Sequence, residues 1–145
     1  MITSQSISDP ESLEAFRVQL QAAGLPYEDL ALRNNLLFNY FNENELVGTG
    51  GVEVYGNFGL IRSVSITENS RGKKLGSEIT QHLIKASKEN HLKGLYLLTE
   101  TAREFFLKHG FMVVDRDQVD ESVKVSSEFS HVCPVSATCM YLSLE

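Results

Sequence analysis

The chain has 145 residues, of which 42% are hydrophobic and 22% charged, and these values predict a single globular domain over residues 1–145. Thirteen Lys and Arg against nineteen Asp and Glu leave a net charge of −6, which disfavours nucleic acid and anionic membranes as partners. No segment approaches the ~18 consecutive apolar residues of a membrane span, and the N-terminus lacks the basic and apolar parts of an export signal.

The first half of the chain predicts a strand, a helix and then a meander. The strand covers Ile2–Ile7, and the helix runs from Pro10 to about Ala23 with Asp9 as its N-cap. One helical turn is expected around Tyr27–Leu32. Turn residues then separate three β-rich runs, at Leu36–Phe41, Leu46–Tyr55 and Gly59–Ile66.

The second half alternates helices with strands. We expect helices at Leu75–Asn90, Thr101–His109 and Glu121–His131, and strands at Gly94–Thr99, Phe111–Asp115 and Ala137–Leu144. The order predicts an α/β mixed sheet with helices on its faces and a parallel crossover around residues 66–98. In such a sheet a ligand is expected at the carboxyl end of the strand that enters the crossover helix.

A basic turn lies at that strand end, in the sequence SVSITENSRGKKLGS. Gly72 and Gly76 allow the backbone to turn tightly, and the first N–H groups of the following helix have no intrahelical partners. Together with Arg71, Lys73 and Lys74, they favour a phosphate ligand. The alternative is a solvated surface turn.

Two nucleotide-binding motifs are excluded. The basic turn is not a Walker loop, because Ser77 follows Gly76 where the motif requires Lys. The run at residues 48–51 is not a dinucleotide fingerprint, because Glu53 replaces the last glycine and no helix follows. We assign these glycines to a bulged or closely packed strand.

The run RGKKLG after SVSI, then a helix, GLYLLT and TAREFFLKHGF, resembles the acetyl-CoA-binding core of the GNAT N-acetyltransferase superfamily over residues 59–111. Lys74 stands where the motif normally has Gly. The segments LIRSVSI, LYLLTETAREFF and SSEFSHVCPVSATCM are similar to the arsenic-resistance N-acetyltransferases within that superfamily.

The resemblance implies a mostly antiparallel sheet of six to seven strands, with helices on both faces and acetyl-CoA as co-substrate. The central parallel strands, 59–66 and 94–99, would splay apart, and the Val64 N–H would steady the oxyanion. The implied cofactor-binding residues are Val64, Ser65, Ile66, Arg71, Gly72, Lys73, Lys74, Leu75, Gly76, Ser77 and Phe106.

Acyl transfer to an amine needs a base, and Glu53 is the candidate. Its neighbours Gly51, Val52 and Val54 suggest an uncharged setting, and the alternative is a solvent-facing Glu on an alternating strand. Phe106 takes the position where the family often has a Tyr acid, so Tyr96, Tyr55 or a water would protonate the thiolate.

Arg62 interrupts the apolar and small residues of the motif strand. It either binds a substrate carboxylate or other oxyanion, or pairs with an internal acid such as Glu53. No metal site is expected, because the four histidines lack ligand spacing. Cys133 beside Pro134 is read as a small buried hydrophobe rather than an arsenic ligand, and the two cysteines as reduced thiols in the cytoplasm.

We therefore expect an N-acetyltransferase that moves acetyl from acetyl-CoA to the primary amine of a small, anionic acceptor, with a link to arsenic resistance. An acyl-CoA sensor without turnover is the first alternative, and an enzyme that modifies lysines or N-termini of proteins is the second. A homodimer is expected from the resemblance.

Overall fold

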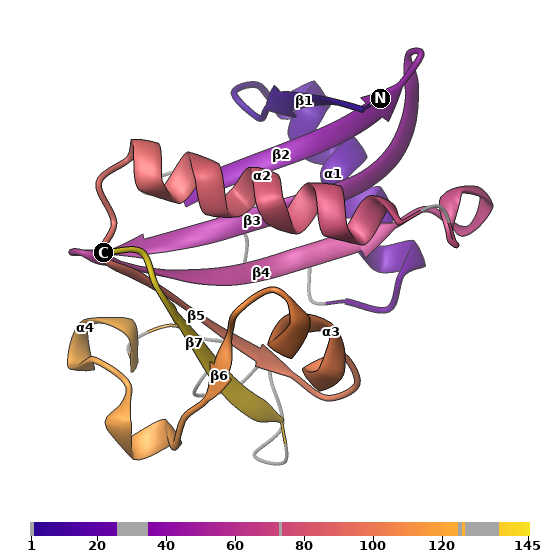
Figure 1. Cartoon of the computed structure of the whole chain (residues 1–145). Coiled ribbons are helices and arrows are strands. Elements are labelled where there is room, and N and C mark those ends of the chain that lie inside the picture. The colour runs from indigo at the N-terminus through magenta and orange to yellow at the C-terminus, as the bar shows by residue number, and fades with distance from the viewer. Residues whose placement is uncertain (1, 26–34, 73, 125, 127–136) are drawn as a thin grey trace.

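The computed structural model of the chain describes residues 2–25, 35–72, 74–124, 126 and 137–145 (Figure 1). The strands are β1 (Thr3–Ser6), β2 (Asn35–Asn42), β3 (Glu45–Tyr55), β4 (Phe58–Ile66), β5 (Gly94–Thr99), β6 (Met112–Val113) and β7 (Thr138–Ser143). The helices are α1 (Pro10–Ala22), α2 (Leu75–Glu89), α3 (Arg103–Lys108) and α4 (Glu121–Lys124). Short 3-10 turns lie at Glu68–Ser70 and Arg116–Gln118.

The expected order of strands and helices is confirmed. Asp9 caps α1 as predicted, since its side chain accepts a hydrogen bond from the Ser12 N–H at 2.7 Å. The helix expected at residues 121–131 is described only at Glu121–Lys124, and the turn expected at residues 27–32 lies outside the described residues. Within the described ranges, no helix is long and apolar enough to cross a membrane.

The seven strands form one sheet in the order β1-β2-β3-β4-β5-β7-β6, and β4 with β5 is its parallel pair. That pair holds register only from Phe58 opposite Gly94 to Ile61 opposite Leu97. Beyond this point β4 stays paired with β3 as far as Ile66, and β5 stays paired with β7 as far as Thr99. The two central strands therefore splay apart at their carboxyl ends, as the resemblance predicts.

Helices cover both faces of the sheet. On one face α2 and α3 pack on a core that includes Ile79, Leu83 and Phe106. On the other, α1 buries Phe16 and Leu20 against the sheet, and α4 buries Val123. Figure 1 shows α2 lying along β3 and β4 on the near face.

Small residues on β3 let α2 approach the sheet closely. A Cβ added at Gly48 would lie 2.5 Å from the Ser65 carbonyl oxygen and 2.9 Å from Ile79 Cδ1. One added at Gly50 would lie 3.1 Å from both Ile79 and Leu83. The glycines at residues 48–51 thus mark close packing, as the sequence suggested.

Candidate active site

A β-bulge interrupts β4 just where it separates from β5. Gly51 lies opposite Arg62 but Thr49 lies opposite Ser65, so two residues of β4, Ser63 and Val64, face one of β3. Ser63 has a φ of 61°, a left-handed conformation that is uncommon for a residue with a side chain. Backbone held in such a conformation is concentrated at functional sites, which makes the bulge the first structural marker of this one.

The basic turn follows the same strand and leads into α2. Gly72 has a φ of 84° and Lys74, the N-cap of α2, a φ of 61°. No side chain caps this helix in the described structure, so its first N–H groups are open to a ligand. Arg71 reaches back and donates from Nε to the Ile66 carbonyl at 3.4 Å. Lys73 lies outside the described residues.

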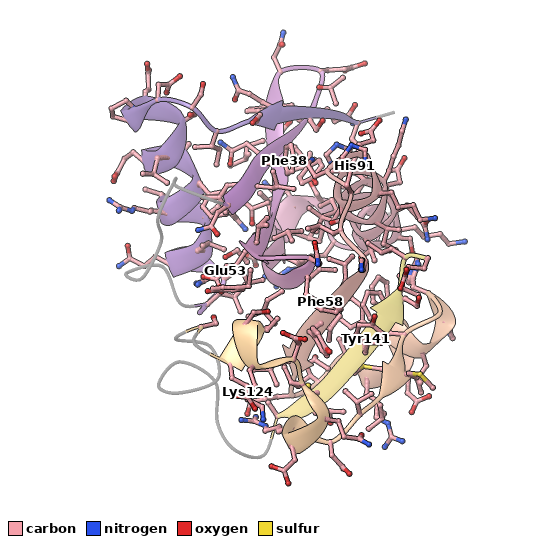
Figure 2. The ribbon with its side chains drawn as sticks, turned by 90° about the vertical axis from the view of Figure 1, so that its left-hand side faces the viewer. Phe38, Glu53, Phe58, His91, Lys124 and Tyr141 are labelled. Atoms are coloured by element: carbon pink, nitrogen blue, oxygen red, sulfur yellow. The ribbon has the colours of Figure 1, made fainter. Side chains whose placement is uncertain are left out.

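Glu53 and Arg62 lie together on the sheet face that carries α1 and α4, and Figure 2 shows Glu53 between these two helices. Arg62 Nη1 is 3.3 Å from Glu53 Oε2, and Ser126 Oγ donates to Glu53 Oε1 at 2.5 Å. Both residues are buried, with 6% of Glu53 and 4% of Arg62 exposed. Pairing with an internal acid, one of the two alternatives for Arg62, is therefore present.

The expectation that Glu53 has an uncharged setting is wrong, because the Arg62 guanidinium contacts its carboxylate. Val52 and Val54 adjoin Glu53 along the chain and suggested apolar surroundings. Successive residues of a strand point to opposite faces, however, so these two side chains do not surround the carboxylate. The alternative of a solvent-facing Glu53 is also wrong, because Glu53 is buried, with 6% of its surface exposed.

The described tyrosines near this cluster differ in their surroundings. Burial raises the pKa of the Tyr55 phenol, and the Glu53 carboxylate acts in the same direction, so Tyr55 keeps its proton at neutral pH. Tyr96 Oη accepts a hydrogen bond from the Asp120 N–H at 3.3 Å. Phe106 is buried in α3, with its ring centroid 5.0 Å from that of Phe105 and 5.6 Å from that of Phe111.

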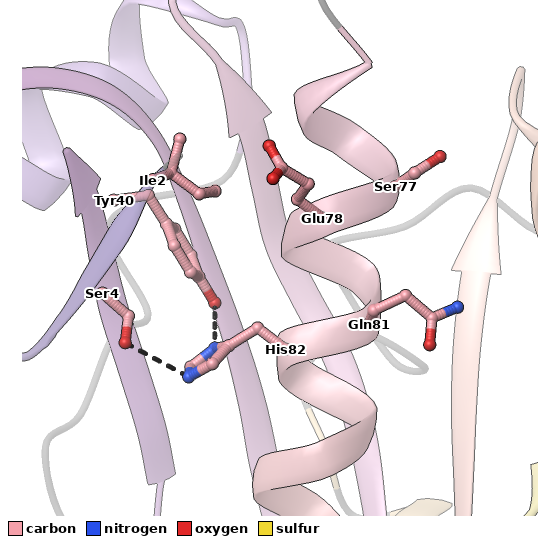
Figure 3. Close-up of a pocket in the computed structure, with 7 residues that line it drawn as sticks. All are labelled: Ile2, Ser4, Tyr40, Ser77, Glu78, Gln81 and His82. Atoms are coloured by element: carbon pink, nitrogen blue, oxygen red, sulfur yellow. Dashed lines mark hydrogen bonds between the residues drawn. The ribbon is translucent and has the colours of Figure 1, made fainter. Parts of the chain in front are cut away.

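A pocket of about 410 Å³ lies between α2, the edge strand β1 and its neighbour β2 (Figure 3). His82 bridges its wall: Nδ1 is 2.7 Å from Tyr40 Oη and Nε2 is 3.2 Å from Ser4 Oγ. Burial lowers the pKa of His82 and raises that of Tyr40, so both are neutral at pH 7. The pocket reaches the start of α2 at Ser77 but not the Glu53–Arg62 pair.

No group of His, Cys, Asp and Glu in the described part of the chain is arranged to hold a metal ion. Cys139 is buried on β7, and burial raises its pKa to about 11, so it is a protonated, unreactive thiol at neutral pH. Cys133 lies outside the described residues, as does His131.

Sequence reasoning missed three residues of this site. Ser63 carries the bulge, and Thr49 and Ser126 reach Ser63 and Glu53 from other parts of the chain. The register shift lies between Thr49 and Gly51 of β3, within the glycine run for which a bulged or closely packed strand was expected, but that expectation did not name Ser63. The other two contacts join residues 14 and 73 positions apart, which no local pattern encodes.

The geometry fits a CoA thioester. Backbone groups between Arg62 and Ile66 lie where β4 has left β5, and no described strand replaces β5 there. Buried backbone groups require partners, and the amides of a pantetheine arm can supply them. At the end of the same strand, the open N-terminus of α2 and its cationic turn suit a diphosphate.

Comparison with known proteins identifies the family of the chain. The family model described as "Acetyltransferase (GNAT) family" matches residues 5–111. The chain belongs to the GNAT acetyltransferase family.

Three known proteins illustrate what the chain is similar to. Streptothricin acetyltransferase A of Bacillus subtilis (strain 168) is 31% identical over 81 residues, which cover 52% of this chain and 47% of that protein. The chain thus spans less than half the length of this curated relative. N-acetylglutamate synthase from Neisseria gonorrhoeae, solved with coenzyme A and L-arginine, has a TM-score of 0.80 at 11% identity, covering 99% of this chain and 33% of that one.

The ribosomal-protein-S18-alanine N-acetyltransferase from Escherichia coli has a TM-score of 0.71 at 14% identity, covering 100% of this chain and 95% of that one. These two structural likenesses, at low identity, are likenesses of fold. The three relatives are named for acetyl transfer or synthesis on very different acceptors, so they do not specify the acceptor of this chain.

Proposed function

We propose that this chain is an N-acetyltransferase that moves acetyl from acetyl-CoA to the primary amine of a small acceptor. The observation that carries the proposal is the bulge at Ser63, placed where β4 leaves β5 and followed on the same strand by the uncapped N-terminus of α2. Thioester and diphosphate would thus be bound by one continuous stretch of backbone, residues 62–77. Family membership is consistent with this assignment.

In this mechanism the amine nitrogen bonds to the thioester carbon, the carbon–sulfur bond breaks, and CoA leaves as a thiolate. The Val64 N–H at the bulge would steady the negative charge that develops on the thioester oxygen. The N–H groups of residues 75–77, together with Arg71 and Lys74, would hold the diphosphate. Each role is assigned to a residue already placed by the fold.

The nitrogen loses two protons: one when the ammonium becomes the attacking amine, and one when the tetrahedral adduct becomes the amide. Glu53 is the proposed acceptor of the first, and the second passes to solvent water. Glu53 lies opposite Leu60, three residues from Ser63, or about 10 Å along the strand at the usual rise. We therefore expect the proton to reach Glu53 through water. The Arg62 contact would keep the carboxylate oriented.

For the acid that protonates the thiolate, three alternatives remain. Tyr55 lies opposite Phe58, five residues or about 17 Å along the strand from Ser63, and is the most remote. Tyr96 lies opposite Leu60, and the hydrogen bond that its Oη accepts from the Asp120 N–H does not use its own O–H proton. Water is the simplest donor, because a CoA thiolate is a stable leaving group that can take its proton after departure.

The proposal that the acceptor is negatively charged rests on Arg62. The proposed link to arsenic resistance rests on the segment SSEFSHVCPVSATCM, most of which lies outside the described residues. With its side chain 1% exposed and paired to Glu53, Arg62 would have to exchange partners to bind a carboxylate. Arg62→Lys should then raise KM for amino-acid acceptors but not for uncharged amines. An equal change in KM for amino-acid acceptors and for uncharged amines would contradict the proposal that Arg62 binds an anionic acceptor.

The experiment that tests the function has two stages. Acetyl-CoA at ~100 times its dissociation constant should raise the free energy of unfolding by ~2.7 kcal/mol, measured by thermal unfolding. Thiol release is then measured with a panel of small amines, amino acids and a lysine peptide. No stabilisation overturns CoA binding. Stabilisation without release favours the sensor, and release with the peptide alone favours a protein-modifying enzyme.

A further inference from the structure

We propose that Thr49 is a positioning residue for acetyl transfer, which holds the Ser63 backbone in its left-handed conformation and so aims the Val64 N–H. The inference rests on the proposed function, because it concerns the donor that this function assigns to the developing oxyanion. It adds a residue of β3 that contacts neither the thioester nor the diphosphate in that scheme.

The first observation is a directed chain of hydrogen bonds that ends on the bulge. Thr49 Oγ1 donates to the Ser63 carbonyl at 2.7 Å and lies 2.6 Å from Ser65 Oγ. A hydroxyl has one proton to donate, so Ser65 must be the donor in the second bond. Gln19 Nε2 on α1 donates in turn to Ser65 Oγ at 3.3 Å, which fixes the order Gln19, Ser65, Thr49, Ser63.

The second observation is that the part of these hydrogen bonds that reaches the bulge, from Ser65 through Thr49 to Ser63, is buried. Thr49 is 0% exposed, Ser65 5% and Ser63 9%. A buried carbonyl that loses its donor keeps the full penalty of its removal from water. The Ser63 carbonyl therefore has a strong preference for the orientation in which Thr49 reaches it.

The third observation is that the conformation needs support. Ser63 has a Cβ, and at a φ of 61° an L-residue other than glycine is less stable than in the extended region. Arg62 Nε donates to Ser63 Oγ at 3.1 Å, so the side chain is tethered as well as the carbonyl. Thr49 thus holds the carbonyl of Ser63 and Arg62 holds its side chain. Because the Ser63 carbonyl and the Val64 N–H belong to the same peptide group, fixing one orients the other.

The test compares Thr49→Val, which keeps the shape and removes the hydroxyl, with the matched control Thr49→Ser, which keeps the hydroxyl. We expect Thr49→Val to lower kcat by roughly ten- to a hundredfold, somewhat less than the 10²–10³ lost with a whole oxyanion donor. KM for acetyl-CoA should change by less than about twofold, because the diphosphate contacts lie at residues 71–77. Thr49→Ser should keep kcat within about threefold of the wild type.

A second pair of variants separates positioning from simple loss of stability. Glycine adopts positive φ without penalty. In a Ser63→Gly background, Thr49→Val should therefore lower kcat by a much smaller factor than it does alone. If Thr49→Val alone does not fold, the double variant should recover folded protein, and failure to do so would overturn the inference.

The outcomes are distinguishable. Thiol release by the wild type together with an unchanged kcat in Thr49→Val would overturn the positioning role and leave the proposed function standing. Equal losses in Thr49→Val and Thr49→Ser, or equal losses with and without Ser63→Gly, would also overturn it. A wild type that binds acetyl-CoA but releases no thiol with any amine would overturn the proposed function, and the inference with it.

Discussion

Arg62 contacts Glu53 and Ser63 at once, with Nη1 3.3 Å from Glu53 Oε2 and Nε 3.1 Å from Ser63 Oγ. One guanidinium therefore joins the candidate base on β3 to the bulge on β4. In this buried position each charge offsets part of the cost of removing the other from water.

A double-mutant cycle should reveal that dependence. Arg62→Met leaves the Glu53 carboxylate buried without its cation, and we expect the free energy of unfolding to fall by about 3–5 kcal/mol. Adding Glu53→Gln should restore part of this loss. Urea denaturation of the two single variants and the double variant measures the coupling, and strictly additive losses would show that the pair is energetically unimportant.

Lys74 occupies a left-handed position with a φ of 61° at the start of α2. Lys74→Gly should therefore unfold with a free energy about 1 kcal/mol higher than Lys74→Ala, since glycine alone relieves the backbone strain. Both variants lose the same cation, so acetyl-CoA binding should weaken in both. Thermal unfolding without ligand makes the comparison, and equal midpoints would contradict a strained turn.

Two glycines near the end of β4, one on β3 and one on α2, should respond differently to alanine. Gly48→Ala places a Cβ 2.5 Å from the Ser65 carbonyl oxygen and should lower the free energy of unfolding by about 1–3 kcal/mol. Gly76→Ala meets only the Phe105 ring at 3.5 Å and should leave it equal or about 0.5 kcal/mol higher. An unchanged free energy of unfolding in Gly48→Ala would refute the close packing of Gly48 against Ser65 and Ile79.

Gly76 has a second expected role that the same variant tests. If backbone of α2 approaches a diphosphate closely at this position, Gly76→Ala should raise the Kd for CoA by about tenfold, or ~1.4 kcal/mol, while the free protein stays stable. Isothermal titration of CoA measures this change. An unaltered Kd would show that the backbone does not approach the diphosphate closely at Gly76, and that another residue of 71–77 would have to make this contact.

His82 should make stability depend on pH. Burial lowers its pKa in the folded state, and Lys85 adds to this while Glu89 opposes it. Above a pH of about 6.5, the ordinary pKa of His, His82 is neutral in both the folded and the unfolded protein, and its contribution to the free energy of unfolding is fully present. As pH falls, the unfolded state takes a proton first, so stability declines until the pH passes below the folded pKa.

His82→Gln should therefore lose less stability than the wild type between pH 7.5 and 5, as measured by urea denaturation at each pH. His91→Asn is the matched control, because His91 is exposed and its φ of 63° suits Asn. The control should keep the wild-type pH dependence. If the free energy of unfolding of His82→Gln changed with pH as steeply as that of the wild type, groups other than His82 would cause the pH dependence.

Local patterns in the sequence determined a large part of this protein. The helix from Pro10 followed from the Asp9 cap, the meander from its turn residues, and α2 from the stripe that begins at Leu75. The basic turn was visible because Gly72, Gly76 and three cations stand together in an acidic chain. These features depend on neighbours within a few positions, which is the range over which backbone preference and side-chain periodicity act.

Tertiary structure alone decided the contacts that make the site. The bulge at Ser63 is a mismatch between two strands, so neither strand contains it by itself. Thr49, Ser65 and Gln19 meet only after β3, β4 and α1 have packed, and Glu53 acquires Arg62 and Ser126 in the same way. The sequence placed the cationic turn, but packing fixed the buried hydrogen bonds, because a polar group removed from water must take whichever partner the fold brings within reach.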